Sequence, residues 1–287
     1  MKVSGFTFVR NAVKFNYPAA QSIKSILPIC DEFIVNVGDC DDGTLELIES
    51  IGDPKLKIIK TAWNDRMRTK GFVYGQQKTI AHYSCTGDWA FYLETDEVVH
   101  EEDLPRIYGA MEKNLERPEV EALVFDYVHF YGNHATYLDS PAWYRRAPRI
   151  IRNSIRAFSP DGLYFVVFDR HNKKGRYPKA ALAGAKIYHY GWARPESQMN
   201  VKSRDVQRFW SKEHKDISYA AIDPTILREF KGSHPAAIMD WLPEEPAHFQ
   251  PDPSYRLSTR DKRQRVKMLI ERLTGIDTSK KYHKLVK

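Results

Sequence analysis

Strand-like and helix-like segments alternate over the first hundred residues. The apolar segments 3–9, 33–37 and 56–59 have the composition of buried strands, and apolar residues recur at helical spacing over 17–27 and after Thr44. Chains that alternate in this way form βαβ units, in which parallel strands share one sheet and helices cover its faces. The sequence therefore predicts an α/β fold with a mostly parallel sheet flanked by helices.

An acidic cluster follows one of the predicted strands. The apolar run Trp89–Leu93 comes after a Gly-Asp turn and ends in three acids within four positions, Glu94, Asp96 and Glu97. If the strand continues through them, Glu94 and Asp96 point the same way, because strand side chains alternate. Carboxylates placed side by side repel each other and require a cation, a proton or a hydroxyl-rich ligand. Mg²⁺ or Mn²⁺ suits such a site, and the alternative is an ordinary acidic loop.

Length and composition limit the class of protein. The 287 residues suffice for one substantial core, and a hydrophobic content of 42% with 13% aromatic residues argues against a disordered chain. No apolar run approaches the roughly 20 residues of a membrane-spanning helix, and the first ten residues favour a strand over a signal peptide. Three widely spaced cysteines, Cys30, Cys40 and Cys85, fit a reducing compartment rather than a disulfide framework. We therefore expect a cytoplasmic protein.

The chain carries excess positive charge, much of it near the end. A net charge of +7 predicts an anionic partner, either a nucleotide, a phospholipid surface or a nucleic acid. After the proline-rich stretch 243–253 we expect a boundary near residue 250 and then a basic amphipathic helix over 259–273. Its apolar stripe consists of Val266, Leu269, Ile270 and Leu273. This helix is expected to contact an anionic membrane, or else to pack on the preceding domain or on a second subunit.

The second half of the chain is less regular. Segments 121–131, 149–152 and 185–192 are strand-like, and 199–209 is predicted to be helical. The loops between them contain aromatic residues, glycine and proline, and we expect them to form one wall of a binding cleft.

Taken together, these segments resemble family-2 glycosyltransferases, which use the GT-A fold, a Rossmann-like α/β fold. The motifs that carry the resemblance are Val9-Arg10-Asn11, Asp42-Gly43-Thr44, Lys78-Thr79, Gly87-Asp88-Trp89, Glu94-Thr95-Asp96-Glu97 and His189-Tyr190-Gly191-Trp192. The sequence departs from the family pattern where Val37-Gly38 replaces an acid pair and where Glu94 replaces the first acid of Asp-x-Asp. Lys78 replaces an arginine, which keeps the charge but loses the bidentate fork.

The resemblance implies a nucleotide-sugar half at about 1–100, an acceptor half at about 101–250 and a helical tail at 251–287. It implies Mn²⁺ or Mg²⁺ held by Asp96, with Glu94 and His189 as further candidate ligands. The candidates for binding a UDP- or GDP-linked sugar are Arg10, Asn11, Asp39, Asp42, Lys78 and Glu94. For Asp42 a turn and helix cap is an alternative role, and for His189 the alternative is a packing role.

An inverting enzyme of this family needs a carboxylate that deprotonates the acceptor hydroxyl. The preferred candidate is Asp161, in a loop that follows Ser159-Pro160, and the other candidates are Asp126, Asp139 and Asp169. Candidates for stacking on acceptor sugars are Trp143, Tyr144 and Trp192. For each of these residues the alternative is a loop-capping or packing role.

The leading hypothesis is a cytoplasmic, metal-dependent glycosyltransferase of polysaccharide biosynthesis that acts on a glycan or glycolipid acceptor with inversion. A sugar nucleotidyltransferase is the first alternative, but the segment 10–14 lacks the glycines that its N-terminal loop needs. A non-catalytic nucleic-acid-binding protein is the second alternative. The acids of the predicted cleft oppose it, because they repel phosphates, so no nucleic acid is expected as a partner.

Overall fold

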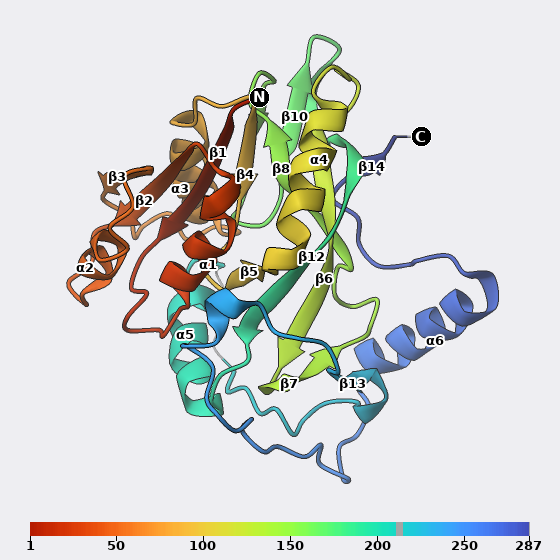
Figure 1. Ribbon diagram of the computed structural model, residues 1–287. Helices are drawn as coiled ribbons and strands as arrows, with labels where there is room; N and C mark the ends of the chain where they lie inside the picture. Colours follow the sequence, from red (N-terminus) through yellow and green to blue (C-terminus); the bar gives the residue numbers. More distant parts are fainter. Residues whose placement is uncertain (211–214, 287) are drawn as a thin grey trace.

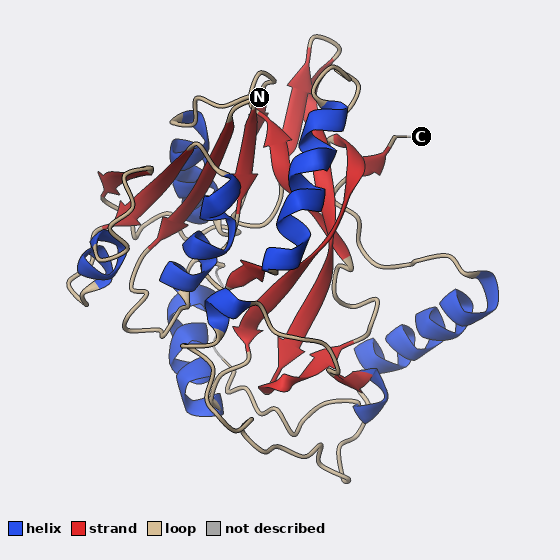
Figure 2. Cartoon of the chain, viewed as in Figure 1, coloured by secondary structure: helices blue, strands red, loops and turns tan. Residues whose placement is uncertain are grey.

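One curled sheet passes through the protein, and helices cover both of its faces (Figures 1 and 2). The computed structural model describes residues 1–210 and 215–286. Along the main sheet the strands follow the order β13-β7-β6-β8-β4-β1-β2-β3, and β12 lies beside β6, where it also pairs with β5 and β14. The strands of this sheet are β1 (Val3–Val9), β2 (Glu32–Gly38), β3 (Leu56–Thr61), β4 (Trp89–Tyr92), β5 (Glu97–Val99), β6 (Ala122–Tyr131), β7 (Asn133–Leu138), β8 (Arg146–Arg152), β12 (Lys179–Trp192), β13 (Leu227–Glu229) and β14 (Lys284–Leu285). The helices are α1 (Ala19–Ile26), α2 (Thr44–Glu49), α3 (Phe72–Tyr83), α4 (Leu104–Asn114), α5 (Glu196–Arg208) and α6 (Thr259–Thr274). A small second sheet contains β9 (Ala157–Phe158), β10 (Val166–Asp169) and β11 (Asn172–Arg176).

The first hundred residues form the parallel part of the sheet. β3, β2, β1 and β4 are parallel neighbours in this order. β1 and β2 are almost entirely buried, because α1 packs on one face with Ile23 and Ile26 and α3 packs on the other with Ala81. This burial on both faces explains the continuously apolar strand sequences, and it confirms the predicted α/β architecture.

The rest of the sheet is mixed. β8 is antiparallel to both β4 and β6, whereas β12 is parallel to β6 and antiparallel to β5. The strands predicted at 121–131, 149–152 and 185–192 correspond to β6, β8 and β12, although β8 and β12 begin earlier than expected. The strands of the first part of the chain therefore pair with one another only in parallel, whereas the second part contains both parallel and antiparallel pairs.

The strand that leads to the acidic cluster stops before the acids. β4 ends at Tyr92, and a turn follows in which the amide of Glu97 donates to the carbonyl of Glu94 at 3.0 Å. The expectation that Glu94 and Asp96 project from one strand face is therefore wrong, because the strand has already ended. β5 then pairs with β12 so that Glu97 lies opposite His189. The turn and this pairing bring the acids to the histidine.

A glycine in α3 allows a distant loop to pack against the helix. A Cβ atom on Gly75 would lie 2.4 Å from the carbonyl oxygen of Ser159 and 2.7 Å from that of Pro160. Any larger residue would therefore push away the loop that carries Asp161. α3 begins at Phe72, and one turn after Gly75 the hydroxyl of Thr79 accepts the backbone amide of Ser159 at 3.3 Å.

The C-terminal helix α6 confirms the prediction over 259–273, and a capping box begins it at Ser258. In Figure 1 it stands apart from the sheet. Two ion pairs tie it to the rest of the protein, Arg265 with Asp223 and Glu271 with Arg145, each at 2.8 Å.

The apolar stripe of α6 faces solvent. Val266, Leu269, Ile270 and Leu273 are 58%, 54%, 43% and 76% exposed. The sequence offered packing of this stripe on the preceding domain as one alternative. The exposed side chains show that the stripe does not pack there. No helix within residues 1–210 and 215–286 is both long and apolar enough to cross a membrane.

Candidate active site

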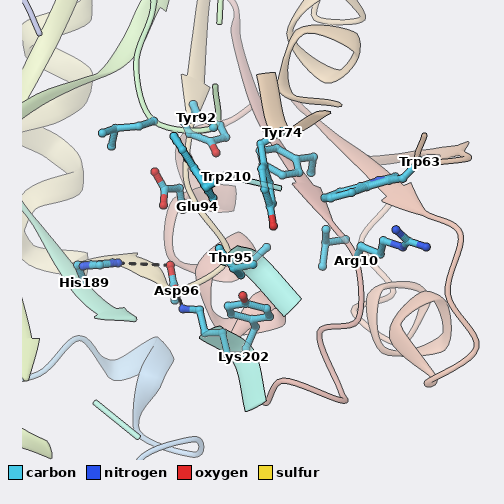
Figure 3. A pocket seen from close by; sticks show the side chains of 16 residues that line it. Arg10, Trp63, Tyr74, Tyr92, Glu94, Thr95, Asp96, His189, Lys202 and Trp210 are labelled. Carbon is cyan, nitrogen blue, oxygen red and sulfur yellow. Dashed lines mark hydrogen bonds and ion pairs between the residues drawn. The ribbon is translucent and has the colours of Figure 1, made fainter. Parts of the chain in front are cut away.

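A cavity of about 330 Å³ opens beyond the carboxyl ends of β1 and β4. Ligands of parallel α/β sheets bind at this edge. Figure 3 shows the side chains around it. The residues that line it are Phe8, Val9, Arg10, Tyr17, Trp63, Tyr74, Tyr92, Glu94, Thr95, Asp96, Gly162, Leu163, His189, Lys202, Val206 and Trp210.

Glu94, Asp96 and His189 converge at one end of the cavity (Figure 3). One possible ligand atom from each residue lies within 4.8 Å of the other two, and Nε2 of His189 is 3.5 Å from Oδ1 of Asp96. A Cβ atom on Gly191 would lie 2.6 Å from Nε2 of His189 and 3.0 Å from Oδ2 of Asp96, so this glycine keeps the space beside them open. Two carboxylates and an imidazole form a donor set that suits Mn²⁺, and a divalent ion therefore fits the cluster.

Cations also surround Asp96. Nζ of Lys202, on α5, lies 2.9 Å from Oδ2 of Asp96, and Nη2 of Arg194 lies 3.9 Å from the same oxygen. Burial alone would raise the pKa of Asp96, but Lys202, His189 and Arg194 outweigh burial and hold that pKa well below its usual value. The Nε and Nη2 atoms of the buried Arg194 have no hydrogen-bond partner among the described residues. Phosphate oxygens would satisfy such donors.

A fully buried ion pair supports the acidic turn. Nε and Nη2 of Arg149 donate to the two carboxylate oxygens of Glu97 at 2.7 and 2.6 Å, and Nη2 also donates to Oε1 of Glu94 at 2.9 Å. The hydroxyl of Tyr127 donates to the Glu97 carboxylate as well, at 2.8 Å. Both oxygens of the Glu97 carboxylate are therefore hydrogen-bonded within the fold, and Glu97 stabilises the acidic turn. Burial and the nearby Glu97 raise the pKa of Glu94 to about 7, although Arg149 opposes this shift.

A second histidine determines which nitrogen of His189 carries a proton. Nε2 of His129 lies 2.8 Å from the carbonyl oxygen of Tyr144 and donates to it, so Nδ1 of the same neutral ring can only accept. Burial lowers the pKa of His129 to about 3, so this ring is neutral. Nδ1 of His189 lies 3.0 Å from Nδ1 of His129 and is therefore the donor. A neutral His189 keeps its lone pair on Nε2, beside Asp96, where a metal ligand needs it.

Arg10, Trp63 and Tyr74 form the opposite end of the cavity (Figure 3). The guanidinium of Arg10 lies 5.3 Å from the centre of the Trp63 ring, which meets the Tyr74 ring edge to face at 5.3 Å. The carboxylate of Asp39 accepts the backbone amide of Trp63 at 3.0 Å and lies 3.4 Å from Nη2 of Arg10. Arg10 thus lines the cavity, whereas Asp39 lies outside the lining and positions one wall.

Glu94 lines the cavity, whereas the other nucleotide-side candidates, Asn11, Asp42 and Lys78, lie outside its lining. Asp42 accepts the backbone amide of Lys14 at 2.8 Å and holds a turn, as its alternative role predicts. Asn11 belongs to the same loop and has a positive φ of 56°. Lys78 is 0% exposed on α3, and its ammonium donates to the carbonyl of Gly162 at 3.2 Å.

Among the predicted bases, Asp161 lies beside the cavity, because the two residues that follow it line the cavity. Its Oδ1 accepts the amides of Leu163 and Tyr164 at 2.8 and 3.3 Å, and burial raises its pKa. Asp126 instead pairs with Arg146 at 2.6 Å on the surface. The remaining candidates form ion pairs outside the cavity, Asp139 with Arg145 and Asp169 with Arg176.

Several residues of the site carry no signal in the sequence. They are Tyr17, Trp63, Tyr74, Arg194, Lys202 and Trp210. Arg149 does carry one, because it is a charged residue beside Ile150-Ile151 in a predicted strand. The aromatic candidates Trp143 and Trp192 pack against each other outside the cavity, with ring centres 5.7 Å apart, and Tyr144 packs on the His129 ring at 4.8 Å.

Neither a family model nor a curated protein matches the sequence. Similar solved structures include TarS 1-349 of S. aureus, at 15% identity and a TM-score of 0.37 over 54% of this chain and 48% of that chain. Glucosyl-3-phosphoglycerate synthase of Mycobacterium tuberculosis, solved with Mn²⁺, UDP and glucosyl-3-phosphoglycerate, is 16% identical with a TM-score of 0.33 over 46% and 45%. Mannosyl-3-phosphoglycerate synthase of Rubrobacter xylanophilus is 20% identical with a TM-score of 0.31 over 45% and 41%. The matched part is less than half of each of these chains, and the similarity is partial. The function of the present chain therefore has to follow from its own site.

Proposed function

We propose that this chain is a nucleotide-sugar-dependent glycosyltransferase with its donor site in the cavity around Asp96. The convergence of Glu94, Asp96 and His189 at the carboxyl edge of a parallel sheet, beside Arg194 and Lys202, supports this proposal. A divalent ion and adjoining cations together neutralise a departing diphosphate. The aromatic end of the cavity takes the base and ribose of a UDP- or GDP-linked sugar. The acceptor is a glycan or glycolipid, as in polysaccharide biosynthesis.

Asp96, Glu94 and His189 are the residues that would hold Mn²⁺ or Mg²⁺. When bound, the ion neutralises the negative charge that develops on the diphosphate leaving group. His189 offers Nε2 because its Nδ1 proton is donated to His129. An imidazole ligand favours Mn²⁺ over Mg²⁺.

Transfer also requires a base on the acceptor side, and we assign this role to Asp161. The acceptor oxygen attacks the anomeric carbon, and its proton passes to the Asp161 carboxylate. The bond between the anomeric carbon and the diphosphate oxygen breaks, and the nucleoside diphosphate leaves with the bonding electron pair. Attack opposite the leaving group inverts the anomeric configuration.

Asp161→Asn is expected to lower the rate of transfer by about 10²- to 10⁴-fold without weakening nucleotide binding. A base must be deprotonated, and burial raises the pKa of Asp161. As the pH is lowered, the wild-type rate should therefore begin to fall at a pH above the ordinary aspartate pKa of about 3.9. Measuring kcat/KM against pH for both proteins checks this. An unchanged profile and rate in Asp161→Asn would exclude the residue as the base.

Binding of UDP with Mn²⁺ is expected to raise the Tm. A ligand that binds only the native state raises the free energy of unfolding by about 2.7 kcal/mol at a ligand concentration of about 100 times Kd. Thermal unfolding with UDP, GDP and ATP, each with Mn²⁺, Mg²⁺ or excess chelator, identifies the nucleotide and the metal. A donor site of this kind is ruled out if no nucleoside diphosphate stabilises the protein, or if the chelator leaves both binding and transfer unchanged.

The alternatives gain no support from the site. The loop that follows β1, residues 10–18, contains no glycine, which disfavours a sugar nucleotidyltransferase. Release of pyrophosphate from a nucleoside triphosphate would revive that alternative. Binding to nucleic acid that falls steeply with salt and persists in Asp96→Asn would favour the nucleic-acid-binding alternative.

We further propose that the tail contacts an anionic membrane surface through α6, at the cytoplasmic face. The exposed stripe at 266–273 is accompanied by the exposed Arg260, Lys262 and Arg263. The helix acids are engaged elsewhere, since Asp261 caps the helix start and Glu271 pairs with Arg145. A helix that presents apolar and basic residues together binds anionic lipid interfaces.

Co-sedimentation with vesicles of phosphatidylcholine and phosphatidylserine is expected, and it should be lost in Leu269→Gln/Leu273→Gln. Pure phosphatidylcholine vesicles should bind less, because they lack negative charge. Met239→Gln, which alters a similarly exposed apolar residue away from α6, is the matched control and should bind like the wild type. Membrane contact through α6 is refuted if the double variant still sediments like the wild type.

A further inference from the structure

A second cavity adjoins the donor cavity. Leu163 and Trp210 line both cavities, and Figure 3 shows Trp210 between the acidic cluster and the aromatic end of the first. The second cavity has a volume of about 700 Å³. Its walls come from the loop before α3 with the start of that helix, the loop 160–164, Trp210 after α5 and the segment that follows α6. Four separate parts of the chain therefore build this space.

Positive charge dominates the lining of this second cavity among residues 1–210 and 215–286. Arg66 and Lys70 line it from the loop before α3, and Lys280 lines it from the C-terminal segment. None of the three forms an ion pair with another residue of 1–210 or 215–286. Arg68 adds a fourth cation, and among the described lining residues Asp161 alone carries a carboxylate. Like charges held together repel one another, and an anion that enters the cavity relieves this repulsion.

Aromatic rings stand beside these cations. Tyr164 and Tyr282 stack with their ring centres 5.0 Å apart and an interplanar angle of 21°. The ammonium of Lys280 lies 4.7 Å from the centre of the Tyr282 ring, so charge and ring face the same region. Trp210 completes the wall toward the donor cavity. Rings of this kind pack on the apolar faces of sugars, while the cations hold an anionic substituent.

We propose that the second cavity binds the acceptor, and that the accepting sugar or polyol unit of this glycan or glycolipid bears an anionic group such as phosphate. Arg66, Lys70 and Lys280 bind the anion, and the tyrosine rings pack on the carbon skeleton. Asp161 lies at the boundary between the two cavities, where it meets the hydroxyl that attacks. The inference rests on the proposed function, because it requires the first cavity to be the donor site.

The test compares two probes that differ only in one phosphate. Glucose 6-phosphate and glucose are titrated calorimetrically into the protein saturated with UDP and Mn²⁺, and UDP binding is measured separately. The variant Arg66→Gln/Lys280→Gln removes two cations that lie outside the donor cavity. The matched control Lys24→Gln/Lys113→Gln removes the same charge from exposed positions on α1 and α4.

Glucose 6-phosphate is expected to bind, and glucose at least about tenfold more weakly. Arg66→Gln/Lys280→Gln should weaken glucose 6-phosphate by at least about tenfold, as expected for lost charge-assisted hydrogen bonds, and should leave UDP affinity unchanged. The control variant should match the wild type.

The inference is overturned if neither probe binds, if both bind equally, or if the two variants weaken binding alike. It is also overturned if the wild type binds UDP-glucuronate more tightly than UDP-glucose and Arg66→Gln/Lys280→Gln removes this difference. The cations would then bind an anionic group of the donor sugar. Failure of UDP to bind, with cation-dependent binding of glucose 6-phosphate, would refute the donor site and leave an anion-binding cavity.

Discussion

Asp96→Asn is expected to lower the rate of sugar transfer by about 10³-fold, equivalent to about 4 kcal/mol of transition-state stabilisation. Asp96 is the carboxylate on which His189, Lys202 and Arg194 converge. Asparagine keeps the shape of the side chain but removes the negative charge that would hold a divalent ion. Affinity for Mn²⁺, measured by electron paramagnetic resonance, should fall together with the rate.

Asp126→Asn is the matched control for this change. Asp126 forms a half-exposed ion pair with Arg146 outside the cavity, so its variant should transfer sugar and bind Mn²⁺ like the wild type. Circular dichroism and urea unfolding establish that Asp96→Asn remains folded. Wild-type activity in Asp96→Asn, or activity that persists in excess chelator, would contradict the assigned role of the metal.

Arg149→Met is expected to reduce the free energy of unfolding by about 3–5 kcal/mol. Arg149 and Glu97 are both 0% exposed, and methionine leaves the Glu97 carboxylate buried without its cation. In the variant, the pKa of Glu97 in the folded state should rise above its unfolded value. The variant should therefore be less destabilised at low pH and lose further stability as the pH rises through that pKa.

Arg146→Met provides the comparison on the same strand. Arg146 pairs with Asp126 at the surface, where the side chains are 38% and 51% exposed, and such a pair contributes about 0–1 kcal/mol. Urea unfolding of both variants separates the buried pair from the exposed one. Adding Glu97→Gln to Arg149→Met should restore part of the lost stability, because it removes the uncompensated charge. Equal stability losses in Arg149→Met and Arg146→Met would contradict this account of the buried pair.

The sequence determined those features that depend on neighbouring residues. Apolar periodicity predicted β1, β2 and β3 and the helix α6, because burial on two faces or on one stripe leaves a regular local pattern. A short motif indicated Asp96 as the central acid, and a second motif indicated His189. The loop context of Asp161 suggested a position beside the cleft, and the structure places it next to the cavity.

Only the tertiary structure decided what surrounds those acids. Lys202 lies 106 positions from Asp96 in the sequence, and nothing in the sequence of α5 distinguishes it from a solvent-exposed lysine. The contact of Glu97 with Arg149 spans 52 positions. The sequence pattern extended a strand through Glu94 and Asp96, but the strand ends at Tyr92 and the chain turns at Thr95 and Asp96 before β5 pairs with β12. The local sequence pattern around Lys202 and Arg149 does not show that these charged side chains are largely shielded from solvent. Contacts between distant parts of the chain shield them, and periodicity carries no information about such contacts.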